Sequence, residues 1–224
     1  MFSDKIISFY KELKPPLKLP KGISLLYPQQ DPEVMKIVEL FHKKYFNDNK
    51  KRTLAFGINP GRFGAGVTGI NFTAPRQLKE TCKINHPFND QSELSAEFIY
   101  EMIKSSGGAK KFYSKYFISA LSPLGFIMEG KNLNYYDDKD LMKKITPFIV
   151  ECMEKQLQWN INREKCICIG GEKNYKFFLS QNEKHTWFNE IIPLPHPRFI
   201  MQYRSKQKVQ YIEEYIQAFS NSNQ

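Results

Sequence analysis

The sequence contains few cysteines, and their spacing argues against a metal cluster. Only four occur among the 224 residues, at Cys82, Cys152, Cys166 and Cys168, and no CxxC pair is present. Cysteine-based metal sites show closer and more regular spacing. We therefore expect four buried, reduced thiols, and neither a bound metal ion nor a cofactor.

Long hydrophobic runs are also missing. No apolar stretch reaches the length that crosses a bilayer, and the first residues lack the apolar core of a signal peptide. There is no internal repeat and no low-complexity tract. We expect a cytoplasmic monomer without a membrane partner. It should form one domain over residues 1–224, with helices of residues 1–46 packed on it and a frayed tail at 220–224.

Acidic residues are outnumbered. The chain has 33 Lys and Arg against 23 Asp and Glu, which gives a net charge of +10. This excess favours an anionic partner, either a nucleic acid or an acidic membrane surface, unless the charge is spread evenly. Aromatic residues make up 14% of the chain, and exposed rings can stack on bases. The composition therefore favours nucleic acid.

Strands and helices alternate along the chain. Short apolar runs at residues 54–58, 116–121, 165–170 and 189–194 predict four strands. Amphipathic patterns predict helices over residues 2–13, 173–179 and 206–219, and the last of these should bury Val209. Further helices are predicted to start at residues 31, 95, 137 and 146. Residues 73–92 show no period and predict a loop over one sheet edge. This alternation is typical of an α/β fold with a mostly parallel sheet covered on both faces.

One glycine-rich stretch follows the first predicted strand. Asn59 and Pro60 are followed by a set of glycines at Gly61, Gly64, Gly66 and Gly69. Such a stretch forms a loop whose backbone other atoms can approach closely. It lacks the Gly-Lys-Ser/Thr ending of a phosphate-binding P-loop. It also lacks the acidic residue that follows a dinucleotide-binding loop.

A second polar residue follows the last predicted strand. His196 stands between two prolines, directly after the apolar run that ends at residue 194. Ligands of open α/β sheets bind at the carboxyl ends of strands, where Asn59 and His196 would meet. Both residues could instead be ordinary turn formers. His42, His86 and His185 have no such context, and we expect them at the surface.

Together these stretches resemble the uracil-DNA glycosylase superfamily. The pattern Gly-x-Asn-Pro-Gly-x-Phe-Gly, followed by Thr-Gly and Phe, is present from Gly57 to Phe72, and His196-Pro197 matches the second motif. The similarity extends over about residues 50–215 and is closest to the bacterial second branch of the single-strand-selective monofunctional enzymes. It implies a three-layer αβα sandwich around a four-stranded sheet. It also implies that a DNA base is removed by hydrolysis of its N-glycosidic bond.

The resemblance assigns roles to the motif residues. His196 would donate a hydrogen bond to the departing base, and Asn59 would position the attacking water. Phe72 would stack on the base, although a core phenylalanine is the competing interpretation. Gly61 would keep the loop open for the deoxyribose. The remaining predicted base-binding residues of this set are Ile58 and Phe63.

One position departs from the family pattern. Where the closest relatives carry an asparagine that reads the Watson–Crick edge of the base, this chain has Ala120. Ser119 and Ser122 flank it and could supply weaker contacts. We therefore expect a broader pocket that accepts uracil or a related deaminated base such as xanthine. No lysine falls in either motif, so a Schiff-base lyase step is not expected.

The segment after His196 predicts contacts to DNA. Phe199 and Met201 are apolar and could insert as a wedge at the flipped-base gap. A hydrophobic staple for the last helix would explain them equally well. Arg198, Arg204 and Lys173 are predicted to contact phosphates, or to be ordinary solvated charges.

The sequence thus predicts a cofactor-free monofunctional DNA glycosylase acting on single- or double-stranded DNA. Two alternatives stay open. One is a damaged-DNA binding module without catalysis, because Ala120 departs from the family pattern. The other is a nucleotide or nucleoside hydrolase that uses the glycine-rich loop for phosphate.

Overall fold

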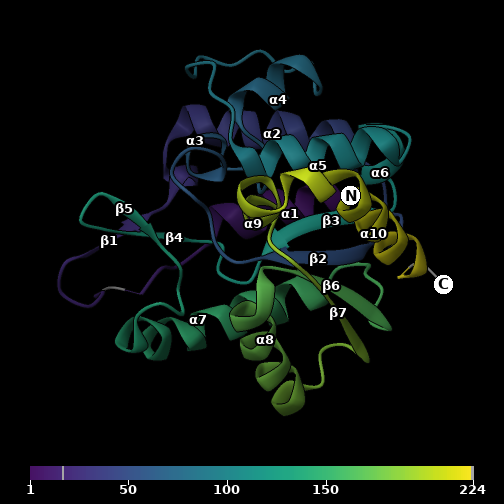
Figure 1. Cartoon of the computed structure of the whole chain (residues 1–224). Coiled ribbons are helices and arrows are strands. Elements are labelled where there is room, and N and C mark those ends of the chain that lie inside the picture. The colour runs from purple at the N-terminus through teal and green to yellow at the C-terminus, as the bar shows by residue number, and fades with distance from the viewer. Residues whose placement is uncertain (17, 223–224) are drawn as a thin grey trace.

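The fold is built on a four-stranded parallel sheet. The computed structural model describes residues 1–16 and 18–222. The sheet has the order β3-β2-β6-β7, with β2 (Thr53–Gly57), β3 (Tyr116–Ala120), β6 (Lys165–Ile169) and β7 (Glu190–Leu194). Each neighbouring pair is parallel. Helices lie on both sides of this sheet (Figure 1), so the predicted αβα sandwich is confirmed.

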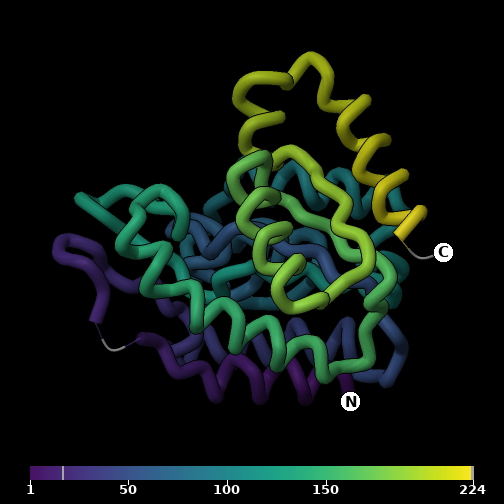
Figure 2. Tube along the Cα trace, turned by 90° about the horizontal axis from the view of Figure 1, so that it is seen from below, coloured from purple at the N-terminus to yellow at the C-terminus, as the bar shows by residue number. Residues whose placement is uncertain are grey.

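Two groups of helices cover opposite faces of the sheet. Phe117 of β3 packs against Phe2 of α1 (Phe2–Lys11) and Phe46 of α2 (Pro32–Phe46). Its neighbour Tyr116 packs against Phe219 of α10 (Lys208–Asn221). Successive side chains of a strand point to opposite faces. The N-terminal and C-terminal helices therefore lie on opposite sides of the molecule (Figure 2).

The remaining helices complete the two layers. They are α3 (Ala65–Thr68), α4 (Pro75–Glu80), α5 (Leu94–Ser105), α6 (Ala109–Tyr113), α7 (Lys139–Leu157), α8 (Gly171–His185) and α9 (Pro197–Tyr203), with short 3-10 helices at Pro28–Gln30 and Ser205–Gln207.

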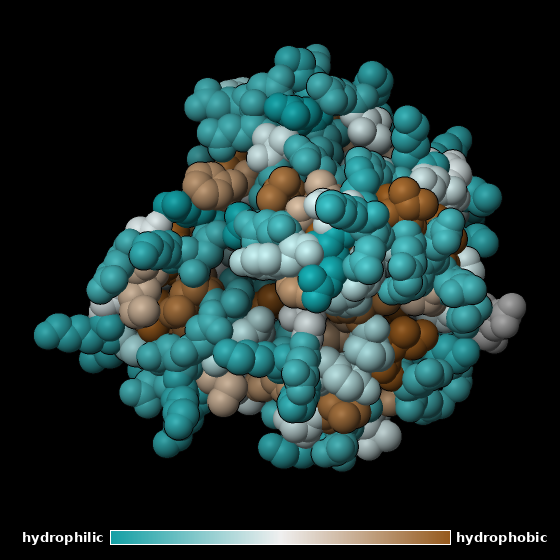
Figure 3. Space-filling model, viewed as in Figure 1, coloured by the Kyte–Doolittle hydropathy of each residue, from teal (hydrophilic) through white to brown (hydrophobic). Residues whose placement is uncertain are grey.

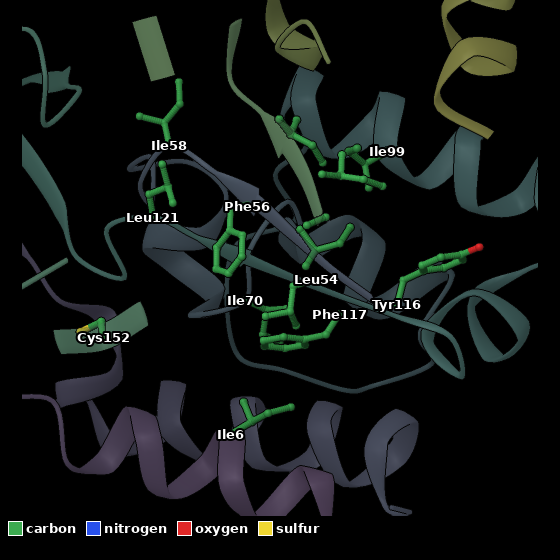
Figure 4. Packing of buried hydrophobic residues seen from close by; sticks show 14 of the residues in the cluster. Ile6, Leu54, Phe56, Ile58, Ile70, Ile99, Tyr116, Phe117, Leu121 and Cys152 are labelled. Carbon is green, nitrogen blue, oxygen red and sulfur yellow. The ribbon is translucent and has the colours of Figure 1, made fainter. Parts of the chain in front are cut away.

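Buried apolar side chains form one cluster that runs from α1 to α10. Leu54 and Phe56 of β2 lie in its centre, with Ile6 of α1 on one side and Ile99 of α5 on the other (Figure 4). All four cysteines lie in or beside this core as free, buried thiols, as the sequence predicted. Burial raises the pKa of Cys152 and of Cys168 to about 12, so both stay protonated at neutral pH.

A second, smaller sheet was not predicted. It is antiparallel in the order β1-β4-β5, formed by β1 (Ile23–Leu26), β4 (Gly125–Met128) and β5 (Lys131–Leu133). It lies to one side of the main sheet (Figure 1). Its Gly125 packs so closely on the carbonyl of Pro60 that a Cβ there would collide with it. The small sheet therefore supports the glycine-rich loop directly.

Several element predictions were wrong in detail. Helix α7 is continuous through Pro147, where two helices were predicted. Helix α4 interrupts the predicted loop 73–92, and helix α9 was not predicted. The last helix includes residues 220 and 221, so the tail is not frayed there. Residues 223–224 of that prediction lie outside the described part.

Two predicted exposures are reversed. Val209 was expected in the core of the last helix but is 68% exposed, and Tyr215 is buried in its place. His42 was expected at the surface but is only 2% exposed. It lies on the inner face of α2, where its Nδ1 is 2.7 Å from the carbonyl oxygen of Val38. Burial lowers the pKa of His42 to about 4, so the ring is neutral.

The face of the molecule in Figure 3 is mostly hydrophilic, and hydrophobic residues show on it only as separate patches. Within residues 1–16 and 18–222, no helix is both long and apolar enough to cross a membrane.

Candidate active site

A cavity opens where the four parallel strands end. Its volume is about 370 Å³, within the range of small-molecule pockets of roughly 300–1,000 Å³. Residues at or just beyond the carboxyl end of each strand line it, namely Gly57, Ala120, Gly170 and His196. The other lining residues are Ile58, Asn59, Gly61, Ala65, Asn71, Phe72, Glu93, Ser95, Asn132, Asn134, Tyr136, Arg198, Phe199, Gln202 and Tyr203. The predicted meeting of Asn59 and His196 at one sheet edge is therefore observed.

The side chain of Asn59 is fixed by the end of β5 and the residues that follow it. Its Oδ1 accepts a hydrogen bond from the backbone N–H of Tyr135 at 3.1 Å, and its Nδ2 donates to the carbonyl of Leu133 at 3.3 Å. A flipped amide would place like groups against each other, so this pairing defines the orientation. An amide oxygen accepts two hydrogen bonds, which leaves one lone pair of Oδ1 for a ligand or water.

His196 caps the start of α9 with its own ring. Its Nδ1 accepts the backbone N–H of Arg198 at 3.1 Å, so the proton of the neutral ring lies on Nε2. Burial, aided by the positive charge of Arg198, lowers the pKa of His196 to about 4. The hydroxyl of Tyr215 donates to the carbonyl of Pro195 and anchors the turn before the ring. The site therefore holds a neutral imidazole with an N–H donor.

An aromatic wall stands beside these two groups. The ring of Phe72 lies 5.8 Å from the imidazole of His196, centroid to centroid. Phe72 adopts a left-handed backbone conformation with φ of 52°, which is uncommon for a bulky residue. Its ring covers Gly57, where an added Cβ would lie only 2.7 Å from a ring carbon. The glycine at the end of β2 is what permits this ring position.

Gly61 lies at the mouth of the cavity next to the small sheet. Its carbonyl accepts the backbone N–H of Gly66 at 2.8 Å, which closes the loop on itself. A Cβ at Gly61 would lie 3.3 Å from the Nδ2 of Asn132, so a larger side chain would have to displace that residue. The Oδ1 of Asn132 accepts the N–H of Arg62 at 3.1 Å. The loop is thus held from the β5 side.

Comparison with known proteins assigns the family. The family model described as the uracil DNA glycosylase superfamily matches residues 43–220. The chain belongs to this superfamily. A crystal structure of SMUG2 from Pedobacter heparinus is similar over 99% of this chain and 98% of that chain, with 45% identity and a TM-score of 0.95. No curated protein matches the chain. It is a DNA glycosylase, and its place is in base excision repair.

Five predicted residues of the glycosylase do not line the cavity, namely Phe63, Ser119, Lys173, Met201 and Arg204. Ser119 is buried and turned away, because its hydroxyl donates to Oε1 of Gln156 at 2.8 Å. Phe63 is exposed on the loop, with the guanidinium of Arg62 4.4 Å from its ring centroid. Met201 packs against the hydrophobic core from α9. Ser119 and Met201 were assigned to binding from their sequence neighbours, but their side chains point elsewhere.

The rim of the cavity is aromatic and basic on the α9 side. Phe199 is 42% exposed, and its ring lies 5.6 Å from that of Tyr203, which is 67% exposed. The guanidinium of Arg204 is 5.6 Å from the Phe199 ring centroid. Tyr203 was not predicted, although residues four apart on a helix share a face. Lys173 lies farther along, 3.9 Å from a carboxylate oxygen of Asp137.

Glu93 and Ser95 reach the cavity from a segment that gave no motif signal. A helix was predicted to start at Ser95, but α5 begins at Leu94, and the Ser95 hydroxyl donates to Oε1 of Glu93 at 2.9 Å. Burial raises the pKa of Glu93, and the bond from Ser95 and the charge of Arg198 oppose this shift. Among residues 1–16 and 18–222, no group of three or more His, Cys, Asp and Glu side chains is placed to hold a metal ion.

Proposed function

We propose that the protein acts as a monomer that hydrolyses the N-glycosidic bond of uracil, or of a related deaminated base such as xanthine, in DNA. The observation that carries this proposal is the pair of oriented groups in one cavity. Asn59 and His196 are each held in a single orientation by backbone groups. Such preorganised groups need no rearrangement when charge develops in the reaction.

His196 supplies the donor for the leaving base. Cleavage of the glycosidic bond places negative charge on the departing base, and the neutral ring offers Nε2–H to a base carbonyl. Because the pKa of His196 is about 4, the ring stays neutral at physiological pH. Its hydrogen bond strengthens as charge builds on the base. Loss of one such donor typically costs 10²–10³-fold in rate, on the order of 3–4 kcal/mol.

Asn59 positions the attacking water. The free lone pair of its Oδ1 can accept one hydrogen of a water molecule, but an amide cannot remove a proton at neutral pH. The glycine-rich loop contains no carboxylate to act as a base. We expect the reaction to rely on a dissociative transition state in which the sugar carries positive character before the water adds.

The base pocket has no polar side chain at position 120, where the family carries a residue that hydrogen-bonds to the base. Ala120 lines the cavity at the end of β3 and offers no hydrogen-bonding side chain. Phe72 supplies a stacking wall, worth about 1–3 kcal/mol per base, and the target nucleotide must be flipped out of the duplex to reach it. A pocket with a stacking wall and few polar readers suits more than one deaminated base, xanthine among them.

The reaction should stop at the abasic site. None of the residues found to line the cavity is a lysine, so no amine is placed to attack the sugar. Phe199 and Arg198 lie at the rim and can contact the DNA beside the flipped nucleotide. Tyr203 joins them as a further candidate for stacking.

The test is incision of end-labelled oligonucleotides that carry one uracil, xanthine or hypoxanthine, in single- and double-stranded form. Strand breaks that appear only after alkali establish a monofunctional glycosylase. Asn59→Ala and His196→Ala should each lose at least 100-fold in single-turnover rate, while His185→Ala, at an exposed histidine, should match the wild type.

Each alternative has its own outcome in this test. Tight binding to damaged DNA without any product would establish a recognition module. Neither product nor binding would favour a nucleotide hydrolase. Full activity in either active-site variant would overturn the assignment of Asn59 and His196.

A further inference from the structure

One carboxyl group faces the cavity without a role in the proposed chemistry. Glu93 precedes α5, and its Oε1 accepts the hydroxyl of Ser95 at 2.9 Å. Its Oε2 lies against the α-carbon of Gly64, where an added Cβ would be only 2.6 Å away. No group of residues 1–16 and 18–222 donates a hydrogen bond to Oε2. One carboxylate oxygen is therefore available inside the pocket.

The partial burial of this oxygen is energetically unfavourable. A half-buried carboxyl with an unpaired oxygen loses hydration without full compensation, and burial raises the pKa of Glu93 accordingly. Perturbed titratable groups of this kind are enriched at functional sites. Arg198 lines the same cavity, and its Nε is buried without a partner among the described residues. Glu93 and Arg198 both line this cavity, and the described residues show no ion pair between them.

Glu93 is the only anionic acceptor among the described residues that line the pocket. Ala120 has no polar atom in its side chain, and the hydroxyl of Ser119 is committed to Gln156. His196 can only donate from its Nε2, and the one lone pair of Asn59 Oδ1 that remains is assigned to the attacking water. Uracil, hypoxanthine and xanthine each carry a ring N–H beside a carbonyl, whereas cytosine and adenine carry a bare ring nitrogen there. A carboxylate accepts hydrogen bonds and cannot donate them.

We propose that Glu93 reads the base: its Oε2 accepts a hydrogen bond from the ring N–H that deaminated bases share, in place of the amide that is absent at position 120. The inference rests on the proposed function of this cavity. It makes Glu93 a specificity-determining residue of the glycosylase. Cytosine and adenine would place a lone pair against the carboxylate and would be rejected by repulsion.

The test measures binding separately from cleavage. The probe is a single-stranded oligonucleotide with one 2′-fluoro-2′-deoxyuridine, whose fluorine slows glycosidic cleavage. Its matched partners carry the N3-methylated base or an abasic-site analogue at the same position. The wild type should bind the uracil probe about 10- to 100-fold more tightly than the methylated one, the range of a hydrogen bond to a charged group. Glu93→Ala should lose most of this difference, and its binding to the abasic analogue should equal that of the wild type.

Two control variants separate a role of Glu93 in base recognition from a role in protein stability. Glu97→Ala removes a carboxylate one turn further along α5 that does not line the cavity, and it should keep the full preference. Glu93→Gln keeps the shape and one acceptor oxygen and should give an intermediate preference. Melting temperatures of both Glu93 variants should not fall, because a poorly compensated carboxylate is removed.

Three results would overturn the inference. They are an unchanged preference in Glu93→Ala, a wild type that does not distinguish uracil from its methylated form, and an equal loss of binding to all three probes. The excision assay of unmodified uracil DNA is run in parallel. A wild type that binds with the expected preference but never cleaves would refute the proposed function and leave the reading role of Glu93 standing.

Discussion

Substitution Gly57→Ala should damage the site through the ring of Phe72. A Cβ at position 57 would lie 2.7 Å and 3.0 Å from two ring carbons, where ordinary carbon contacts are about 3.5–4.0 Å. The ring has little freedom to retreat, because the φ of Phe72 is already 52° and the imidazole of His196 lies 5.8 Å away. Overpacking of this kind costs about 1–3 kcal/mol of unfolding free energy. The ring should also move into the space of the base, so single-turnover excision should fall by more than 10-fold.

A double-mutant cycle decides whether Phe72 is the cause. Leucine lacks the two ring atoms that collide, so Gly57→Ala should cost less than half as much in a Phe72→Leu background, measured by urea unfolding. Gly61→Ala is the control for stability, because its Cβ would come no closer than 3.3 Å to any atom, the Nδ2 of Asn132. An equal cost of Gly57→Ala in both backgrounds, within about 0.5 kcal/mol, would refute the reasoning.

Two further predictions concern buried polar groups. First, the pKa values of His42 and His196 are both lowered to about 4 by burial, whereas an unfolded chain protonates histidine near pH 6.5. The unfolded state then binds more protons, so stability should fall by about 3 kcal/mol per histidine as pH drops from 6.5 to 4. Urea unfolding at several pH values measures this loss of stability. His42→Leu should remove one of the two losses, whereas His185→Ala, at an exposed site, should remove neither. The same change of unfolding free energy with pH in the wild type and in both variants would contradict the prediction. Second, Ser119→Ala leaves Oε1 of Gln156 without its donor and should cost about 1–3 kcal/mol of unfolding free energy. The ranking of excised bases should not change, and a shifted ranking would show that Ser119 does reach the base.

The main sheet and the meeting of Asn59 and His196 could be predicted because both depend on local signals. Short apolar runs define the four strands, and polar residues directly after parallel strands must gather at one edge. The interruption of a strand by Asn59-Pro60-Gly61 is visible without any structure. Ala120 and Phe72, which the family resemblance assigned to the base pocket, also line the cavity.

Other parts depended on tertiary contacts that no local pattern encodes. The strands β1, β4 and β5 have only three or four residues each, too few to show a period. Pro147 was read as a helix start, but α7 passes through it, and the hydroxyl of Thr146 bonds to the carbonyl of Met142 beside it. Glu93 precedes a helix in a loop without motif, so only the fold shows that its carboxyl enters the pocket.

The active site likewise combines residues that local sequence signals reveal with contacts that only the tertiary structure provides. The motif residue Asn59 carries the polar group, but its orientation comes from backbone atoms of Leu133 and Tyr135. The hydroxyl of Tyr135 in turn donates to Oδ1 of Asn174 at 2.8 Å, which connects this segment to α8. Because the positioning groups are backbone atoms, many side chains satisfy the requirement at residue 133. The reacting side chain therefore lies in a short motif that the sequence reveals, whereas the groups that orient it lie in other segments that no motif reveals.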